Sequence, residues 1–256
     1  MKKPKFLLLL PFLLLTIAFI QVQVFEGAEK VVNTQEEQYY RVKDFEDVKK
    51  FDIHIHINTE EEFFMEQAQV DNFRFLDIID DEMTFSQGYY GAHPEYHMYL
   101  HPEYPSYQDQ IDARDHMLEK HPKLTFMGAH LGSLEWSLDE LAKRLDKFPN
   151  MYVDLTRLSN LQLHTFNNRQ KTRAFFIKYQ DRLIYGTDSQ INPSTNPESS
   201  KKSIHDRWLR EWKFYVTDEK ISLENFGTLE GLKLPTEVVD KIYAKNAIRL
   251  LGLQSW

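Results

Sequence analysis

One short segment, residues 51–58 (FDIHIHIN), limits the fold of this chain more than any other, because its apolar and polar residues alternate strictly. Side chains at positions i and i+2 of a β-strand point to the same face, about 7 Å apart. The four apolar residues therefore share one face, and Asp52, His54 and His56 share the other. Two imidazoles at one strand end can bind a single divalent metal ion, or they can simply be solvated histidines at a strand edge.

Downstream of this strand, segments of strand and helix composition alternate. The predicted strands are residues 73–79, 124–130, 151–155 and 183–187, and the predicted helices are residues 60–70, 109–120, 134–147, 169–179 and 236–251, the last stopped by Gly252. Residues 81–107, rich in Tyr, His and Pro, and residues 191–203 are predicted loops. This alternation predicts βα units around a parallel sheet.

Three of the predicted strands end in residues that can bind a metal or move a proton. His54 and His56 end the first strand, His130 ends a later one, and Asp188 follows the last. In parallel α/β folds, functional residues gather at the carboxyl ends of the strands, where the βα loops begin. We therefore expect these four side chains to meet at one edge of the sheet.

Five other residues near these strand ends have supporting or structural interpretations. Gly128 and Gly186 precede two of the candidate residues, and a glycine in a strand often marks a close approach of another segment. Asp154 is interpreted as a satisfied buried polar group or a partner of a ligand. Arg157 lies at a rim position, where it would hold a substrate carboxylate or form a structural salt bridge. Trp136 is expected to pack in the core beneath the following helix.

The chain opens with a basic stretch and then an apolar one. Residues 1–5 (MKKPK) contain three lysines, and residues 6–20 are dominated by Leu. This layout predicts a signal peptide over residues 1–28, or an N-terminal membrane anchor if that segment is not removed. We expect an exported protein, either periplasmic or anchored to a membrane and facing outward, with residues 29–256 as its single domain.

Composition narrows the classes of function. The net charge is −8, and it becomes about −10 without residues 1–28, which hold three Lys and one Glu. Such an acidic body argues against a nucleic-acid partner and leaves a small-molecule substrate as the expectation. The 256 residues include no Cys, which excludes a disulfide framework and a thiolate nucleophile. The 18 Phe and 13 Tyr residues supply ample apolar bulk for a core.

Taken in order, the motifs resemble those of a known family. His-x-His on a first strand, Gly-Ala-His-Leu-Gly at His130 and Tyr-Gly-Thr-Asp at Asp188 are similar to the amidohydrolase superfamily. More narrowly, they resemble the amidohydrolase-2 branch, which includes aminocarboxymuconate-semialdehyde and resorcylate decarboxylases. Residues 242–252 (IYAKNAIRLLG) also resemble the final helix of that branch.

The resemblance implies an α/β fold, a distorted (β/α)8 barrel of the TIM type, holding one divalent metal ion that is commonly zinc. By position, His54, His56 and Asp188 match the metal ligands, and Asp188 also matches a carboxylate that takes a proton from bound water. His130 matches a histidine beside the metal that polarises water or substrate. Zinc lowers the pKa of bound water to about 7, so a nearby carboxylate or imidazole can remove a proton from it.

The spacing of the motifs departs from that branch. His56 and His130 are only 74 residues apart, whereas five βα repeats of about 30 residues would need about 150. The 58 residues from His130 to Asp188 fit two repeats. We therefore expect an incomplete barrel whose middle strands are shortened around residues 80–107. Its two sheet edges would be covered by that segment or by a homodimer.

Three functions agree with these observations. The first is metal-dependent hydrolysis of a small organic substrate, with His130 and Asp188 as catalytic residues. The second is nonoxidative decarboxylation of an aromatic or unsaturated acid, with an arginine such as Arg157 holding the carboxylate. The third is an inactive, truncated relative that acts as a binding module. A fifth-strand histidine ligand has no clear counterpart, and His97 and His101 are the candidates to replace it.

Overall fold

The computed structural model describes residues 38–77, 101–156, 158–223 and 227–254, which belong to one compact unit spanning residues 37–256. The strands are β1 (Lys50–Ile57), β2 (Phe73–Asp77), β3 (Phe126–Gly128), β4 (Met151–Asp154), β5 (Leu183–Ile184), β6 (Ser189–Ile191), β7 (Lys220–Leu223) and β8 (Gly227–Glu230). The helical elements are η1 (Val42–Asp44), α2 (Phe63–Val70), α4 (Tyr107–Lys120), α5 (Ala129–Ser133), α6 (Leu138–Lys147), α7 (Leu158–Lys178), α8 (Pro197–Val216), α9 (Thr236–Asp240), η4 (Lys241–Lys245) and α10 (Asn246–Leu251). None of these helices has the length and apolar character needed to cross a membrane.

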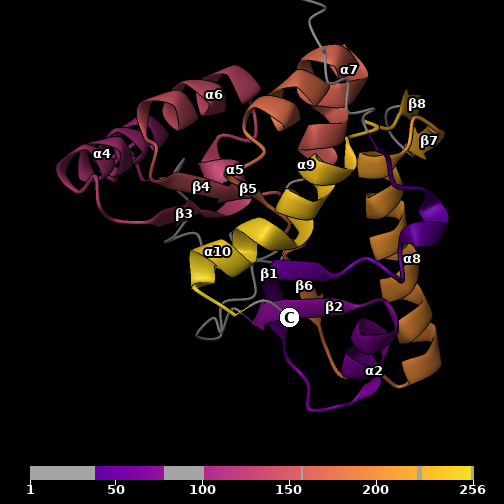
Figure 1. Ribbon diagram of the computed structural model, residues 1–256. Helices are drawn as coiled ribbons and strands as arrows, with labels where there is room; N and C mark the ends of the chain where they lie inside the picture. The colour runs from indigo at the N-terminus through magenta and orange to yellow at the C-terminus, as the bar shows by residue number, and fades with distance from the viewer. Residues whose placement is uncertain (1–37, 78–100, 157, 224–226, 255–256) are drawn as a thin grey trace, which may run out of the picture. The chain divides into compact units, whose positions relative to one another are not determined.

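Six of the strands run parallel in two hydrogen-bonded sets, β2-β1-β6 and β3-β4-β5 (Figure 1). Ile53 N donates to Tyr185 O, just after β5, at 3.1 Å, which joins the two sets, and Asp188 N donates to His54 O at 2.7 Å, next to the pairing of β1 with β6. The chain from β5 to β6 therefore runs along one side of β1, and β2 runs along the other. The predicted α/β class with a parallel sheet is confirmed.

The described strands do not close a barrel. Strand β2 ends one hydrogen-bonded set and β3 ends the other, and no strand in the described ranges joins them. Residues 78–100, which include most of the segment where we expect shortened middle strands, lie outside the described residues. The incomplete barrel therefore stays a prediction.

The prediction of a loop over residues 191–203 is wrong in its second half, because α8 begins at Pro197. The Asn196 side chain accepts a hydrogen bond from Ser199 N at 3.2 Å, and proline stands at the start of the helix. Both features favour helix initiation, although their residue types are also typical of loops. Composition alone therefore did not reveal that Asn196 caps the N-terminus of α8.

Helix α7 is longer than the predicted helix 169–179. It starts at Leu158 and has a kink at Asn168, whose φ is −158°. The Asn168 side chain accepts a bond from Lys171 N at 3.0 Å, so it caps the second segment of the helix. The prediction therefore found only that second segment. The C-terminal helical stretch ends as predicted at Gly252, which has a left-handed φ of 63°.

Aromatic rings attach the helices to the sheet. Trp208 of α8 stacks on Phe73 of β2 with ring centroids 4.2 Å apart, and it also lies 5.9 Å from Phe64 of α2. Tyr243 of η4 stacks on Tyr185, just after β5, at 4.4 Å. These contacts fix the outer helices against both sides of β1, which carries the candidate histidines.

A lysine is completely buried at the start of β1. Lys50 has 0% exposure, and its ammonium group donates to the carbonyls of Phe45 and, at 2.6 Å, of Val48. Nζ also lies 4.3 Å from the ring centroid of Phe45 and 5.0 Å from that of Phe73. Burial lowers the pKa of Lys50 to about 7, although the nearby carboxylates oppose this shift.

Candidate metal centre

Strand β1 and the turn after β5 bring three ligand atoms together. Nε2 of His54 lies 3.5 Å from Asp188 Oδ1, and Nε2 of His56 lies 3.3 Å from the same oxygen. The three ligand atoms all lie within 4.8 Å of one another. Two ligands bound at about 2.05 Å to a tetrahedral zinc ion stand about 3.3 Å apart. The arrangement therefore fits one ion shared by three side chains.

Asp154 fixes the chemical form of the first histidine. It has 0% exposure, and its Oδ2 lies 2.8 Å from Nδ1 of His54. A proton held on Nδ1 leaves the lone pair of Nε2 directed at Asp188, as in carboxylate–histidine–metal triads. Burial of the ring opposes protonation, but the bond to Asp154 and the charges of Asp154, Asp188 and Asp52 raise the pKa of His54. Asp154 agrees with both interpretations offered for it, because it is a buried, hydrogen-bonded polar group and it also contacts the candidate ligand His54.

His130 contacts the other oxygen of Asp188. Its Nε2 lies 3.2 Å from Asp188 Oδ2, and its ring stacks on His54 with centroids 5.4 Å apart and an interplanar angle of 3°. Partial burial tends to raise the pKa of Asp188, but the hydrogen bond from His130 and the charges of the three histidines lower it. Asp188 thus presents one oxygen to the β1 histidines and the other to His130.

The turn that carries His130 is left-handed over four consecutive residues. The φ angles of His130, Leu131, Gly132 and Ser133 are 53°, 55°, 66° and 56°. Each non-glycine residue in this region costs about 1–2 kcal/mol, so other contacts must hold the turn in place. One of them is Asp154 Oδ1, which accepts a bond from His130 N at 2.7 Å.

The two glycines that precede candidate residues do lie at close approaches, as predicted. A Cβ on Gly128 would stand 2.7 Å from Gly132 Cα. A Cβ on Gly186 would stand 3.2 Å from His54 Cβ and 3.3 Å from Asp154 Cβ. A larger residue at either position would therefore displace the segments that carry the candidate ligands.

Asp52 lies on the same face of the predicted strand as His54 and His56, and no role was predicted for it. Its carboxylate accepts bonds from Thr187 Oγ1 at 2.6 Å, Thr187 N at 3.0 Å and His54 N at 3.1 Å. Burial raises the pKa of Asp52 to about 7, although these three bonds favour the charged form. Asp52 thereby joins β1 to the residue before Asp188. The signal available in the sequence was the position of Asp52, two residues before His54 on the same face of the predicted strand.

Several other predicted residues do not join this cluster, or cannot be placed. Arg157 and His97 lie outside the described residues. His101 lies 2.8 Å from Glu103 through its Nδ1 and is not among the ligand atoms grouped within 4.8 Å. The expectation that Trp136 packs in the core is wrong: it is 58% exposed, and its indole N–H donates to the Tyr107 hydroxyl at 2.9 Å.

A family model described as amidohydrolase matches residues 45–253 of this chain, which is most of its length. The chain therefore belongs to the amidohydrolase family. Membership supports an enzyme with metal-dependent hydrolase or decarboxylase activity, and the His and Asp cluster provides residues that could bind the metal. No curated protein and no solved structure matches the chain.

Proposed function

We propose that this chain is a metal-dependent hydrolase of a small organic substrate, with His54, His56 and Asp188 holding one divalent ion. The observation that best supports this is the separation of the two histidine nitrogens from one Asp188 oxygen, 3.5 and 3.3 Å, close to the ligand spacing of a zinc tetrahedron. A divalent ion bound there acts as a Lewis acid and lowers the pKa of water to about 7.

His130 is the group proposed to take the proton from the attacking water. The low pKa of Asp188 keeps its carboxylate ionised, which suits a ligand better than a base. An imidazole is the usual general base near neutral pH, and the His130 ring lies at the centre, with Nε2 3.2 Å from Asp188 Oδ2. To act as the base, Nε2 would first have to give up the proton that it donates to Asp188. The His130 side chain is 30% exposed, against 10% and 8% for His54 and His56, although its Nε2 atom is buried.

We place hydrolysis ahead of decarboxylation because acidic residues line a hollow at the end of β1. A hollow of about 540 Å³ opens where β1 ends, directly after His56, and its lining is Ile57, Asn58, Thr59, Glu60, Glu61 and Pro193. Asn58, the first residue after β1, donates from its Nδ2 to Asn192 Oδ1 at 3.3 Å. Two glutamates at this mouth repel an anionic substrate, which a decarboxylase must bind. The hollow better suits a neutral or cationic one.

Two measurements test the proposal. Purified protein, loaded with zinc or manganese and then dialysed, should retain one equivalent of metal and should hydrolyse members of a panel of esters, lactones and amides. Retention below about one tenth of an equivalent would support the inactive binding module instead. Release of carbon dioxide from hydroxybenzoates, without hydrolysis of any panel member, would support the decarboxylase.

Three variants separate the proposed roles. His54→Ala and Asp188→Ala should each abolish metal retention, because each removes one of three ligands. His130→Gln should keep the metal but lower turnover about 100-fold, the usual loss of a general base. Normal turnover in His130→Gln would show that His130 is not the base.

Export is a further part of the proposal, supported by the basic and apolar composition of residues 1–20. Fractionation of the natural host's cells should recover the protein outside the cytoplasm. Its recovery in the cytosolic fraction would contradict this part while leaving the proposed chemistry intact.

A further inference from the structure

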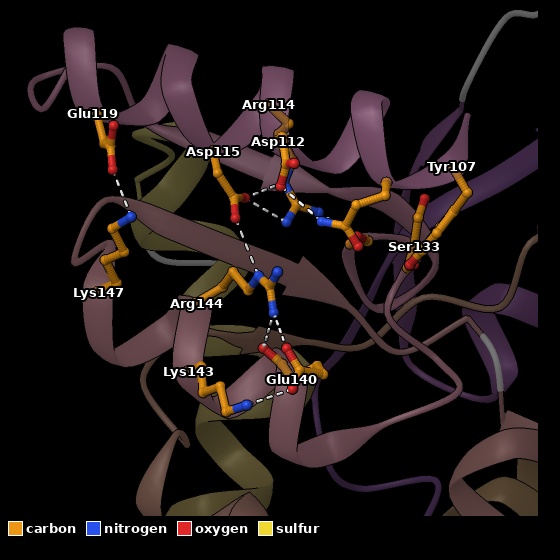
Figure 2. A network of polar contacts seen from close by, with 12 residues as sticks. Tyr107, Asp112, Arg114, Asp115, Glu119, Ser133, Glu140, Lys143, Arg144 and Lys147 are labelled. Carbon is orange, nitrogen blue, oxygen red and sulfur yellow. Dashed lines mark hydrogen bonds and ion pairs between the residues drawn. The ribbon is translucent and has the colours of Figure 1, made fainter. Parts of the chain in front are cut away.

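Two side chains of α4 hold the left-handed turn that carries His130 (Figure 2). Arg114 Nη1 donates to the Gly132 carbonyl at 2.5 Å, and the Tyr107 hydroxyl donates to the carbonyl of Ser133. These are consecutive carbonyls in the turn. The turn therefore has hydrogen bonds at both of its ends, from Asp154 at its beginning and from α4 at its end.

The Arg114 guanidinium is itself fixed in orientation. Asp115 Oδ1 accepts from its Nε at 3.1 Å and from its Nη2 at 2.7 Å, and only 13% of the Arg114 side chain is exposed. Asp115 Oδ2 in turn accepts from Arg144 Nε of α6 at 3.1 Å. A planar guanidinium with three defined bonds has little freedom, so it holds the Gly132 carbonyl in one direction.

Tyr107 connects the end of the turn to the next residues of the chain. Its hydroxyl donates to Ser133 and accepts the indole N–H of Trp136 at 2.9 Å. This second bond gives the exposed Trp136 indole a partner at the surface. The two α4 side chains therefore bind the last two residues of the turn, Gly132 and Ser133.

The turn needs such contacts because its backbone is unfavourable for L-residues. His130, Leu131 and Ser133 all have left-handed φ angles, which residues other than glycine adopt rarely. Without its restraints the turn would relax toward commoner angles, and the His130 ring would rotate away from Asp188. A shift of about 1 Å in a catalytic group can lower a rate about 100-fold.

We propose that Arg114 and Tyr107 are positioning residues that hold the His130 imidazole against Asp188. The catalytic consequence rests on the proposed function, since it requires His130 to be the base. The positioning of the turn itself rests only on the hydrogen bonds that Arg114 and Tyr107 make with it.

The kinetic experiment uses the metal-loaded enzyme and the best panel substrate. Arg114→Met should lower kcat about tenfold, the effect of losing one hydrogen bond from a charged donor, with KM and metal content unchanged. Arg114→Lys should recover part of the loss, and Tyr107→Phe should lower kcat by a smaller factor. Glu119→Gln is the matched control: it breaks the ion pair with Lys147, which also joins α4 to α6 but makes no contact with the turn.

A second measurement does not depend on metal or activity. The imidazole C–H signals of the ten histidines are recorded by NMR in metal-free protein, and His130→Gln assigns the signal of His130. That signal should shift or broaden in Arg114→Met and Tyr107→Phe and stay in place in Glu119→Gln. If Arg114→Met does not fold, Arg114→Lys and Tyr107→Phe decide the question.

An unmoved His130 signal in the folded variants would overturn the inference, whatever the activity. A displaced signal in a protein that hydrolyses no panel member would instead refute the proposed function while the positioning stands. If kcat falls equally in Glu119→Gln, the effect belongs to general stability, and the positioning role is refuted.

Discussion

The buried carboxylate of Asp154 offers the sharpest test of whether this centre binds a metal as proposed. In Asp154→Asn the side chain keeps its shape and can still accept the bond from His130 N through its amide oxygen, now 2.7 Å away. The amide nitrogen then faces His54 Nδ1, at the 2.8 Å now occupied by Oδ2. Two N–H groups cannot share that contact, so the proton of His54 must move to Nε2, the atom that faces Asp188.

The size of the effect follows from the bond that is lost. A hydrogen bond to a charged group contributes about 1.5–3 kcal/mol, and about 1.4 kcal/mol equals a factor of ten in affinity. Metal affinity should therefore fall about 10- to 150-fold, close to the 10- to 100-fold usual for residues that support a ligand. In the metal-free variant, the pKa of His54 should also fall, because Asp154 is a main cause of its elevation.

Affinity is measured by competition with a fluorescent zinc chelator, and the pKa of His54 by NMR titration. Asp71→Asn is a control with an equally buried carboxylate, 2.7 Å from His205 Nδ1; because Asp71 also forms a second group of possible metal ligands with Glu46 and His205, Glu46→Gln is measured beside it to identify metal bound there. Asp71→Asn should lose stability like Asp154→Asn but keep the metal affinity of the proposed site. A metal affinity of Asp154→Asn within about twofold of the native value would refute the reasoning.

Two further changes test features of the fold. Because the pKa of Lys50 falls from its ordinary value to about 7 on folding, the unfolded chain binds more protons between pH 7 and about 10.4. In that window, the free energy of unfolding of the native protein, measured with urea, should therefore rise with pH relative to that of Lys50→Met. The expected slope is up to about 1.4 kcal/mol per pH unit. If the difference in free energy between the two proteins does not change with pH, the pKa of Lys50 is not lowered on folding. Gly128→Ala places a Cβ 2.7 Å from Gly132 Cα, so it should destabilise the protein by about 1–3 kcal/mol in the same assay. Gly128 has a φ of −88°, so the loss comes from the close contact and not from backbone strain, and unchanged stability would contradict the close approach.

The strand positions and the candidate ligands could be predicted from sequence because both depend on local periodicity. Alternation over residues 51–58 gives the strand and places His54 and His56 on one face, and the carboxyl-end rule for parallel strands brings Asp188 to the same edge. The glycines before His130 and Asp188 indicated close approaches, which the structure shows.

The features of the site that could not be predicted from the sequence are contacts between segments far apart in the chain. The bond from Asp154 to His54 spans 100 residues, and the one from Asp52 to Thr187 spans 135. Arg114 and Trp136 look like ordinary helix and core residues until the turn after His130 is seen to be left-handed. The start of α8 was missed for another reason: Asn, Ser and Pro favour both a loop and a helix cap.

The main-chain bond from Asp188 N to His54 O has a consequence for how fast an ion could be captured. Because the two backbones are already fastened at 2.7 Å, only rotations about side-chain bonds separate an empty centre from a filled one. Side-chain rotations are faster than any rearrangement of a sheet, although those of His54 and His56, with 10% and 8% exposure, are slower than rotations at exposed positions. The rates of metal binding and release should then be set by diffusion of the ion and by its dissociation from the ligands, and the protein should remain folded throughout.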